Sequence, residues 1–337
     1  MSFSTVRTCV NQGADLALEA TVAGSFSRVG YQVRRRLFAW PDQLPSLTDQ
    51  VVLVTGATSG LGHATATRLA ALGATVVVTG RDAARTRAVR AELIEATGNH
   101  QIHDVVADLA RLGDVVGLAD RVRSDHPRLD ALIHNAGALV HDYTCTVDGL
   151  ELTVATHVVA PFVLTRRLLG LLRATDGARV VTVTSGGMYT QPLADLDLGP
   201  NGFDGVAAYA KSKRAQVVLN HQWARRTAGQ NIAFHVMHPG WVDTPGLAAS
   251  LPRFHQLMGG WLRTPDQGAD TITWLASQPH LQGDHLWLDR HHRWADKLPW
   301  TVTGDDAGDQ LWAWVVDRAD QVGDHQEESS GTEVGPG

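Results

Sequence analysis

Residues 51–62, VVLVTGATSGLG, decide the fold class of this 337-residue chain. The opening apolar run is typical of a strand buried on both faces of a parallel sheet. Three glycines follow directly and lead into a helical pattern, so the backbone can turn tightly and bring a pyrophosphate to the positive end of a helix. The stretch therefore predicts a dinucleotide-binding loop rather than a plain turn, made of Gly56, Thr58, Ser59, Gly60, Leu61 and Gly62.

Apolar runs rich in β-branched residues alternate with amphipathic stretches beyond this loop. Further strands are predicted at 75–80, 103–108, 129–134, 179–184 and 231–237, each separated by a helical span. Strands joined in this way form a doubly wound, Rossmann-type parallel sheet in a three-layer αβα arrangement. We predict a helical N-terminal extension (1–45), one Rossmann domain (46–300), a helix (301–323) and a disordered acidic tail (324–337).

Composition excludes several classes of function. A formal net charge of −6 does not provide the basic stripe that nucleic acid requires, so no nucleic-acid partner is expected. Two cysteines, without a CxxC pair or an HExxH helix, argue against a disulfide framework and against a metal site. No run of eighteen apolar residues and no signal-peptide pattern occur, and a cytoplasmic protein is expected.

The segment 14–40 mixes small apolar residues with arginines. Such a segment can lie weakly on an anionic membrane surface, or it can form a helical arm that packs on its own domain or on a neighbouring subunit. Both alternatives stay open, and packing on protein is the favoured one.

Three motifs follow the later strands in order. HNAG (134–137) follows the fourth strand, VTVTSGG (181–187) contains Ser185, and YAKSK (209–213) supplies a Tyr-x-x-x-Lys pair. Residues four apart share one helix face, so Tyr209 and Lys213 can point into one cleft. A cation at about 4 Å with an effective dielectric of about 20 contributes about 4 kcal/mol. That energy is enough to lower a phenol pKa by about three units.

Together with TGATSGLG, these motifs resemble the short-chain dehydrogenase/reductase superfamily. The match is closer still to its dehydrogenase/reductase member 12 subgroup, through FDGVAAYAKSKRAQVVL (203–219), MHPGWVDTPG (237–246) and QGADTITWLA (267–276). The resemblance implies hydride transfer between NADP(H) and a small carbonyl or alcohol substrate, with Tyr209 as general acid/base and Ser185 holding the substrate oxygen. By analogy with the family we also expect a homo-oligomer.

The resemblance also implies the cofactor contacts. Lys213, beside Tyr209, would bind the nicotinamide ribose. The remaining contacts are Asp108 and Leu109 beside the adenine, Asn135, Ala136 and Gly137 along its ribose, and Pro239, Gly240, Val242 and Thr244 at the nicotinamide. NAD enzymes of this fold usually carry an acidic residue at the end of the second strand. Gly80 and Arg81 stand there instead, so NADP(H) is favoured and NAD(H) stays open.

VATHVVAPF (154–162) departs from the family pattern, because His157 stands where the superfamily usually has a catalytic asparagine. Pro161 has no N–H, so the carbonyl of His157 loses its helical partner and is expected to be free for water. His157 can therefore replace the asparagine through its ring or through its carbonyl. The alternative is an ordinary core histidine.

Tryptophans 241, 261, 274, 287 and 294 favour an apolar, medium-sized substrate, although each can equally be a core residue. Two other functions stay open. A non-catalytic NADP(H)-binding sensor or scaffold protein would keep the glycine loop, and a sugar epimerase or dehydratase of the extended branch would keep the Tyr-x-x-x-Lys pair.

Overall fold

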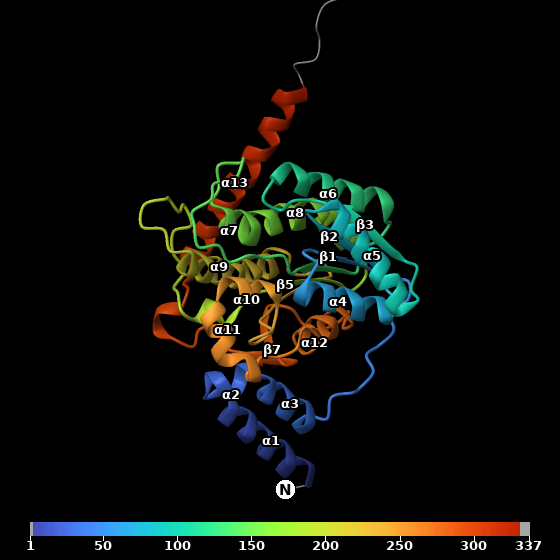
Figure 1. Cartoon of the computed structure of the whole chain (residues 1–337), viewed down its shortest axis with the longest axis vertical. Helices are drawn as coiled ribbons and strands as arrows, with labels where there is room; N and C mark the ends of the chain where they lie inside the picture. The colour runs from blue at the N-terminus through green and yellow to red at the C-terminus, as the bar shows by residue number, and fades with distance from the viewer. Residues whose placement is uncertain (1–2, 331–337) are drawn as a thin grey trace, which may run out of the picture.

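The computed structural model describes residues 3–330, with side chains from residue 11 to residue 321. Eight strands form one sheet in the order β3-β2-β1-β4-β5-β6-β7-β8 (Figure 1). The strands are β1 Val51–Val54, β2 Thr75–Gly80, β3 Ile102–Val106, β4 Ala131–His134, β5 Ala178–Val183, β6 Ile232–Met237, β7 His285–Leu288 and β8 His291–Arg293. The strand order reverses between β1 and β4, which is where ligands bind in doubly wound sheets.

The predicted fold class is confirmed, and the first six strands lie where the apolar runs predicted them. The β7–β8 hairpin was not predicted. β8 runs antiparallel to β7, and the two turn residues, Asp289 and Arg290, both have positive φ angles. Two-residue hairpin turns of this kind usually carry Asn-Gly or Asp-Gly, so the Asp-Arg pair gives no turn signal in the sequence.

Helices cover both faces of the sheet. The α-helices of the described residues are α1 Phe3–Glu19, α2 Val22–Phe26, α3 Arg28–Leu37, α4 Gly60–Ala71, α5 Ala83–Thr97, α6 Leu112–Asp125, α7 Leu152–Val154, α8 Ala160–Ala174, α9 Gly205–Arg226, α10 Pro245–Ser250, α11 Pro252–Met258, α12 Pro265–Ala276 and α13 Asp305–Ser330. Side chains alternate along a strand. Val51 and Leu53 of β1 therefore join the core beneath α6, α8, α9 and α13, whereas Val52 and Val54 join the core beneath α4, α5 and α12.

The helical run Leu152–Ala174 has the length and hydropathy of a membrane span. Within the fold, 61% of its most apolar window is buried. The run packs against α6, as a core helix does.

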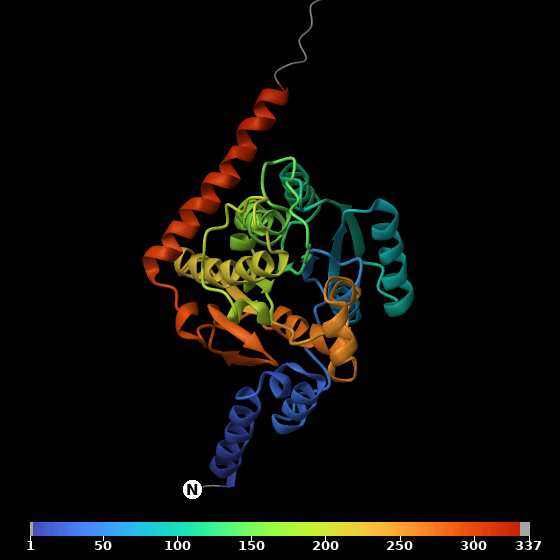
Figure 2. The ribbon, with the colours of Figure 1, turned by 60° about the vertical axis from the view of Figure 1, so that its left-hand side comes forward.

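Helices at both ends of the chain extend beyond the Rossmann body (Figure 2). Helices α1–α3, called the arm below (3–37), lie against the end of the sheet that carries β7 and β8. Helix α13 continues to Ser330, so residues 324–330, expected to be disordered, are helical. The segment lacks proline and contains Glu and Gln, which favour a helix. Residues 331–337, the rest of the predicted tail, lie outside the described residues.

Candidate active site

The glycine loop between β1 and α4 lies directly against the HNAG segment. Gly56 has a φ angle of 64°, and a Cβ atom there would lie 2.7 Å from the Ala136 Cα. The Asn135 Nδ2 donates to the carbonyl oxygens of Thr55 and Gly56, at 3.0 and 3.2 Å. Ser59 makes no side-chain cap to α4, so the first N–H groups of that helix can bind a phosphate group. The loop thus fits a dinucleotide pyrophosphate.

The end of β2 approaches this loop, and two arginines follow that strand in sequence. A Cβ atom on Gly80 would lie 2.4 Å from Thr58, and the Arg81 side chain beside it is exposed. The Arg85 Nε donates to the Thr58 carbonyl oxygen at 3.1 Å, a contact that the sequence did not reveal. Two carboxylates lie beside Arg85: Asp82 caps α5 by accepting from the Arg85 N–H, and Glu92 pairs with the Arg85 guanidinium at 2.5 Å. Arg81, whose side chain is exposed, is therefore the group at this edge that suits an anionic group on the adenine ribose.

Asp108 and Leu109 follow β3, the strand beside β2. The Asp108 carboxylate accepts from the Ala110 N–H at 3.0 Å, which holds the turn. The Leu109 side chain is buried. Both residues therefore lie on the same side of the strand-order reversal as Arg81.

The loop after β6 also approaches the glycine loop. Gly240 has a φ angle of 74°. The Thr244 Cβ would lie 3.2 Å from a Cβ atom on Gly60. Val242 is buried and Pro239 lies at the start of the same loop. Through Thr244, the loop predicted to contact the nicotinamide thus adjoins the glycine loop.

Tyr209, Lys213 and Ser185 lie together at the carboxyl ends of β5 and β6. The Lys213 Nζ donates to the Val183 carbonyl oxygen at 3.0 Å and lies 5.6 Å from the centre of the Tyr209 ring. The Thr184 hydroxyl donates to the Lys213 carbonyl oxygen at 2.8 Å, which fixes α9 on β5. The Ser185 hydroxyl oxygen accepts from the Gly187 N–H at 3.3 Å.

Burial controls the charge of this pair. Burial raises the pKa of Tyr209, and the Ser185 hydroxyl offsets only part of that rise. Burial lowers the pKa of Lys213 to about 7. The expected lowering of the phenol pKa is therefore not found, because the loss of hydration on burial outweighs the opposing effect of the Ser185 hydroxyl. A phenol that stays protonated at neutral pH is suited to donate a proton.

Both ring nitrogens of His157 are occupied in a five-residue π-helix, Ala155–Val159. The Nε2 accepts from the Ala138 N–H at 3.0 Å. The proton is therefore assigned to Nδ1, which donates to the Ser212 hydroxyl at 2.8 Å, and Ser212 donates to the Tyr209 carbonyl oxygen at 2.8 Å. Burial and the charge of Lys213 hold the pKa of His157 well below its usual value. The ring is neutral and joins Ala138, the residue after the HNAG segment, to Ser212 of α9.

The hydrogen-bond partner of the His157 carbonyl differs from the one expected. Its helical partner is missing, but the Gln216 Nε2 donates to its oxygen at 2.9 Å. A side chain of α9 thus replaces the expected water. Gln216 lies seven residues after Tyr209, and this helical spacing is the one sequence signal that could have identified it.

We expect His157→Leu to lower kcat, because it leaves the Ala138 N–H and the Ser212 hydroxyl without their buried partner. Each unpaired group costs about 1–3 kcal/mol. His157→Asn keeps one of the two bonds and should retain more activity. Steady-state kinetics and thermal melting of both variants, with NADPH titrations to check that cofactor binding persists, test this expectation. Full kcat in the leucine variant would make His157 a core residue only.

The tryptophans divide between the core and the surface. Trp274 and Trp287 pack on each other, with ring centres 5.2 Å apart, in the core on the α12 side of the sheet. Trp261 and Trp294 are 51% and 83% exposed. Of the five, Trp241 adjoins the nicotinamide loop directly, and its ring packs edge-on against Phe254 with centres 5.2 Å apart.

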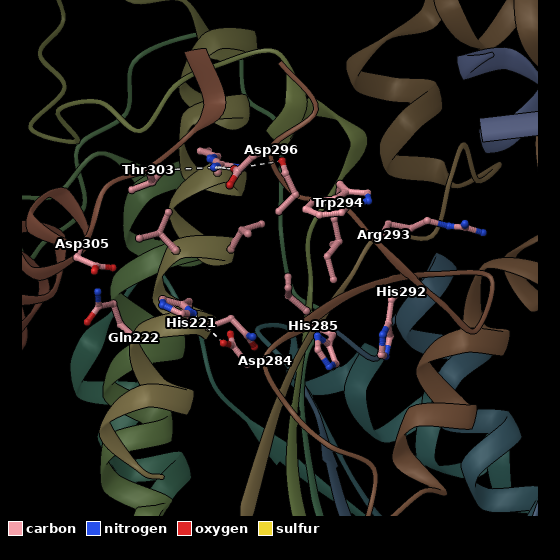
Figure 3. Close-up of a pocket in the computed structure, with 18 of the residues that line it drawn as sticks. His221, Gln222, Asp284, His285, His292, Arg293, Trp294, Asp296, Thr303 and Asp305 are labelled. Carbon is pink, nitrogen blue, oxygen red and sulfur yellow. Dashed lines mark hydrogen bonds and ion pairs between the residues drawn. The ribbon is translucent and has the colours of Figure 1, made fainter. Parts of the chain in front are cut away.

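A cavity of about 500 Å³ opens between α9, the β7–β8 hairpin and the segment before α13 (Figure 3). His221 and Asp284 pair across it at 2.7 Å. Of the residues named in the sequence analysis, Trp294 lines it. No predicted catalytic or cofactor-binding residue does, because Arg214, Val217 and His221 lie on another face of α9 than Tyr209 and Lys213. This cavity is not the candidate active site.

Known proteins resemble this chain in sequence and in fold. The profile of the short chain dehydrogenase family matches residues 50–253. The chain belongs to the short chain dehydrogenase family. Dehydrogenase/reductase SDR family member 12 from Bos taurus is 40% identical over 256 residues, which cover 75% of this chain and 80% of that protein. Retinol dehydrogenase 14 from Mus musculus is 36% identical, over 69% of this chain and 75% of that protein.

A solved structure also supports the family. A short chain dehydrogenase from Shigella flexneri complexed with NADP is 27% identical, with a TM-score of 0.58, and the match covers 72% of this chain and 98% of that one. As a short chain dehydrogenase, the protein is an oxidoreductase with a Rossmann fold. The family match begins at residue 50, so the arm lies outside it.

Proposed function

We propose that the protein transfers a hydride between NADP(H) and an apolar carbonyl or alcohol, with Tyr209 as the general acid/base. The observation that carries this proposal is the meeting of Tyr209, Lys213 and Ser185 at the carboxyl edge of the sheet, beside the glycine loop. These residues have the chemistry that reduction of a carbonyl requires.

Each side chain has a distinct task. Bound NADPH supplies the hydride. The protonated Tyr209 hydroxyl donates to the carbonyl oxygen, and the Ser185 hydroxyl holds that oxygen beside it. Lys213 uses one of its three N–H donors on the Val183 carbonyl, so two remain for the cofactor ribose. His157 and Gln216 fix the position of α9.

An apolar substrate is supported by two observations. Trp241 and Phe254 place aromatic surface beside the nicotinamide loop. A relative at 36% identity is named for retinol, an apolar alcohol.

The proposal is tested with purified protein, NADPH and a panel of apolar aldehydes and ketones, by following the loss of NADPH absorbance. Turnover of at least one class of carbonyl is expected. Tight NADPH binding without turnover over the whole panel would instead favour a non-catalytic sensor or scaffold protein.

Cofactor choice gives a second test. We expect Arg81→Ala to weaken NADPH binding by about tenfold or more, because a hydrogen bond to a charged group contributes about 1.5–3 kcal/mol. NADH lacks the ribose phosphate, so its affinity should hardly change. Arg87→Ala is the matched control, since Arg87 is an exposed arginine of α5 that bonds within its own helix. Equal losses for NADPH and NADH in Arg81→Ala would contradict the assignment.

A further inference from the structure

The arm reaches the active-site loops although it lies outside the family match. The Phe26 side chain, at the end of α2, is 5% exposed. A Cβ atom on Gly186, the residue after Ser185, would lie 2.7 Å from the Phe26 ring. The same ring packs against His238 and Trp241, with centres 4.6 and 6.0 Å away. Phe26 therefore fills the space between the loop after β5 and the loop after β6.

The backbone of Phe26 binds the nicotinamide loop directly. Its carbonyl oxygen accepts from the Trp241 N–H at 2.9 Å. A Cβ atom on Gly240 would lie 2.5 Å from that oxygen. The close approach of the arm is thus one reason why position 240 requires glycine.

Arg263 joins the arm, the nicotinamide loop and the β7–β8 turn. Its guanidinium donates to the carbonyl oxygens of Phe26 at 3.0 Å and Pro239 at 3.1 Å. It also pairs with Asp289 at 2.5 Å, and Asp289 pairs with Arg34 of α3 at 2.8 Å. The side chains of Arg34, Arg263 and Asp289 are at most 1% exposed. The arm cannot leave without separating buried charges, which is costly.

We propose that the arm is a positioning element of the active site. Phe26 and its carbonyl hold the Ser185 loop and the Pro239–Trp241 loop at a fixed separation, so that the Ser185 hydroxyl and the nicotinamide loop face Tyr209. This inference rests on the proposed function for its effect on turnover. A displacement of about 1 Å in a reacting group can cost 100-fold in rate, so the packing of a side chain behind both loops matters.

The test is a set of variants assayed at saturating NADPH. Phe26→Ala should lower kcat by about ten- to a hundredfold, with NADPH binding retained because the pyrophosphate and adenine contacts lie elsewhere. Gly186→Ala should lower kcat as well, because its methyl group meets the Phe26 ring. Adding Phe26→Leu to Gly186→Ala makes room for that methyl and should restore part of the activity. Rescue of kcat, measured below the melting temperature of every variant, shows that the contact between Phe26 and Gly186 controls turnover and not stability alone.

Phe234→Ala is the matched control. Phe234 is a buried aromatic residue of β6 that stacks on Trp223, with ring centres 5.6 Å apart, away from both loops. This truncation should lower the melting temperature and leave kcat unchanged below it. Hydrogen exchange over residues 185–190 and 238–243 provides a readout that needs no turnover, and it should become faster in Phe26→Ala.

The outcomes separate the two proposals. A wild-type protein without turnover overturns the proposed function, and the exchange rates then decide the role of the arm alone. An active wild type, together with Phe26→Ala at wild-type kcat and wild-type exchange, overturns the positioning role of the arm.

Discussion

Tyr209→Phe lowers kcat by about 10²- to 10⁴-fold, the range that a positioned proton donor contributes. The substitution removes only the hydroxyl group and leaves the ring, which packs edge-on against His157 with centres 5.4 Å apart. The contacts that fix α9 run through the Tyr209 backbone carbonyl and through Lys213, and both persist. NADPH binding and the melting temperature should therefore stay near wild-type values.

Steady-state reduction of the best carbonyl of the panel measures this loss, with NADPH titrations alongside. Tyr143→Phe is the matched control, because it removes a phenol hydroxyl from a ring that packs edge-on against Phe203, with centres 5.6 Å apart. A phenylalanine variant at position 209 that keeps more than about a tenth of wild-type kcat would exclude Tyr209 as the general acid.

Asp289→Asn destabilises the protein by about 3–5 kcal/mol, because it leaves two buried guanidinium groups without their shared carboxylate. Burial opposes ionisation of this group, yet Arg263 and Arg34 hold the pKa of Asp289 below its usual value. A carboxyl whose pKa is lowered on folding adds stability above its unfolded pKa, about 3.9, and that stability is lost as the pH falls through the folded value. The stability that the ionised Asp289 contributes should therefore be fully present at neutral pH.

Urea denaturation at pH 7 measures the change in the free energy of unfolding. Asp284→Asn is a closely matched control, since Asp284 has a φ angle of 65° and Asp289 has one of 55°. Asparagine tolerates both conformations. The Asp284 side chain is exposed and pairs with His221, so its loss should cost at most about 1 kcal/mol. Equal losses of unfolding free energy in the two variants would contradict the expectation that the buried ion pairs of Asp289 stabilise the fold more than the exposed pair of Asp284 does.

The features that could be predicted from the sequence are those that depend on the local spacing of residues. The apolar runs located β1 to β6, and the spacing of Tyr209 and Lys213 placed them on one helix face. Contacts between distant segments were not predictable. Nothing local shows that Gln216 reaches the carbonyl of His157, or that Arg85 reaches Thr58.

The role of the arm could not be predicted from the sequence. Arginines 34, 35 and 36 are alike in sequence, and charged side chains are normally exposed. Arg34 is fully buried because Asp15, Glu19 and Asp289 surround its guanidinium, whereas Arg35 remains exposed. Only the tertiary structure distinguishes the buried arginine from its exposed neighbours. The sequence alone therefore does not show that this helix packs on the domain instead of facing solvent.

The Arg34–Asp289 pair also has a consequence for the order in which the protein assembles. The two residues are 255 positions apart. Synthesis runs from the N-terminus, so the ribosome makes the arm first and its buried partner near the end of the domain. The segment that is made first can therefore complete its contact with the domain only after the β7–β8 turn has been made, and until then Arg34 has only the carboxylates of the arm itself, Asp15 and Glu19, as ion-pair partners.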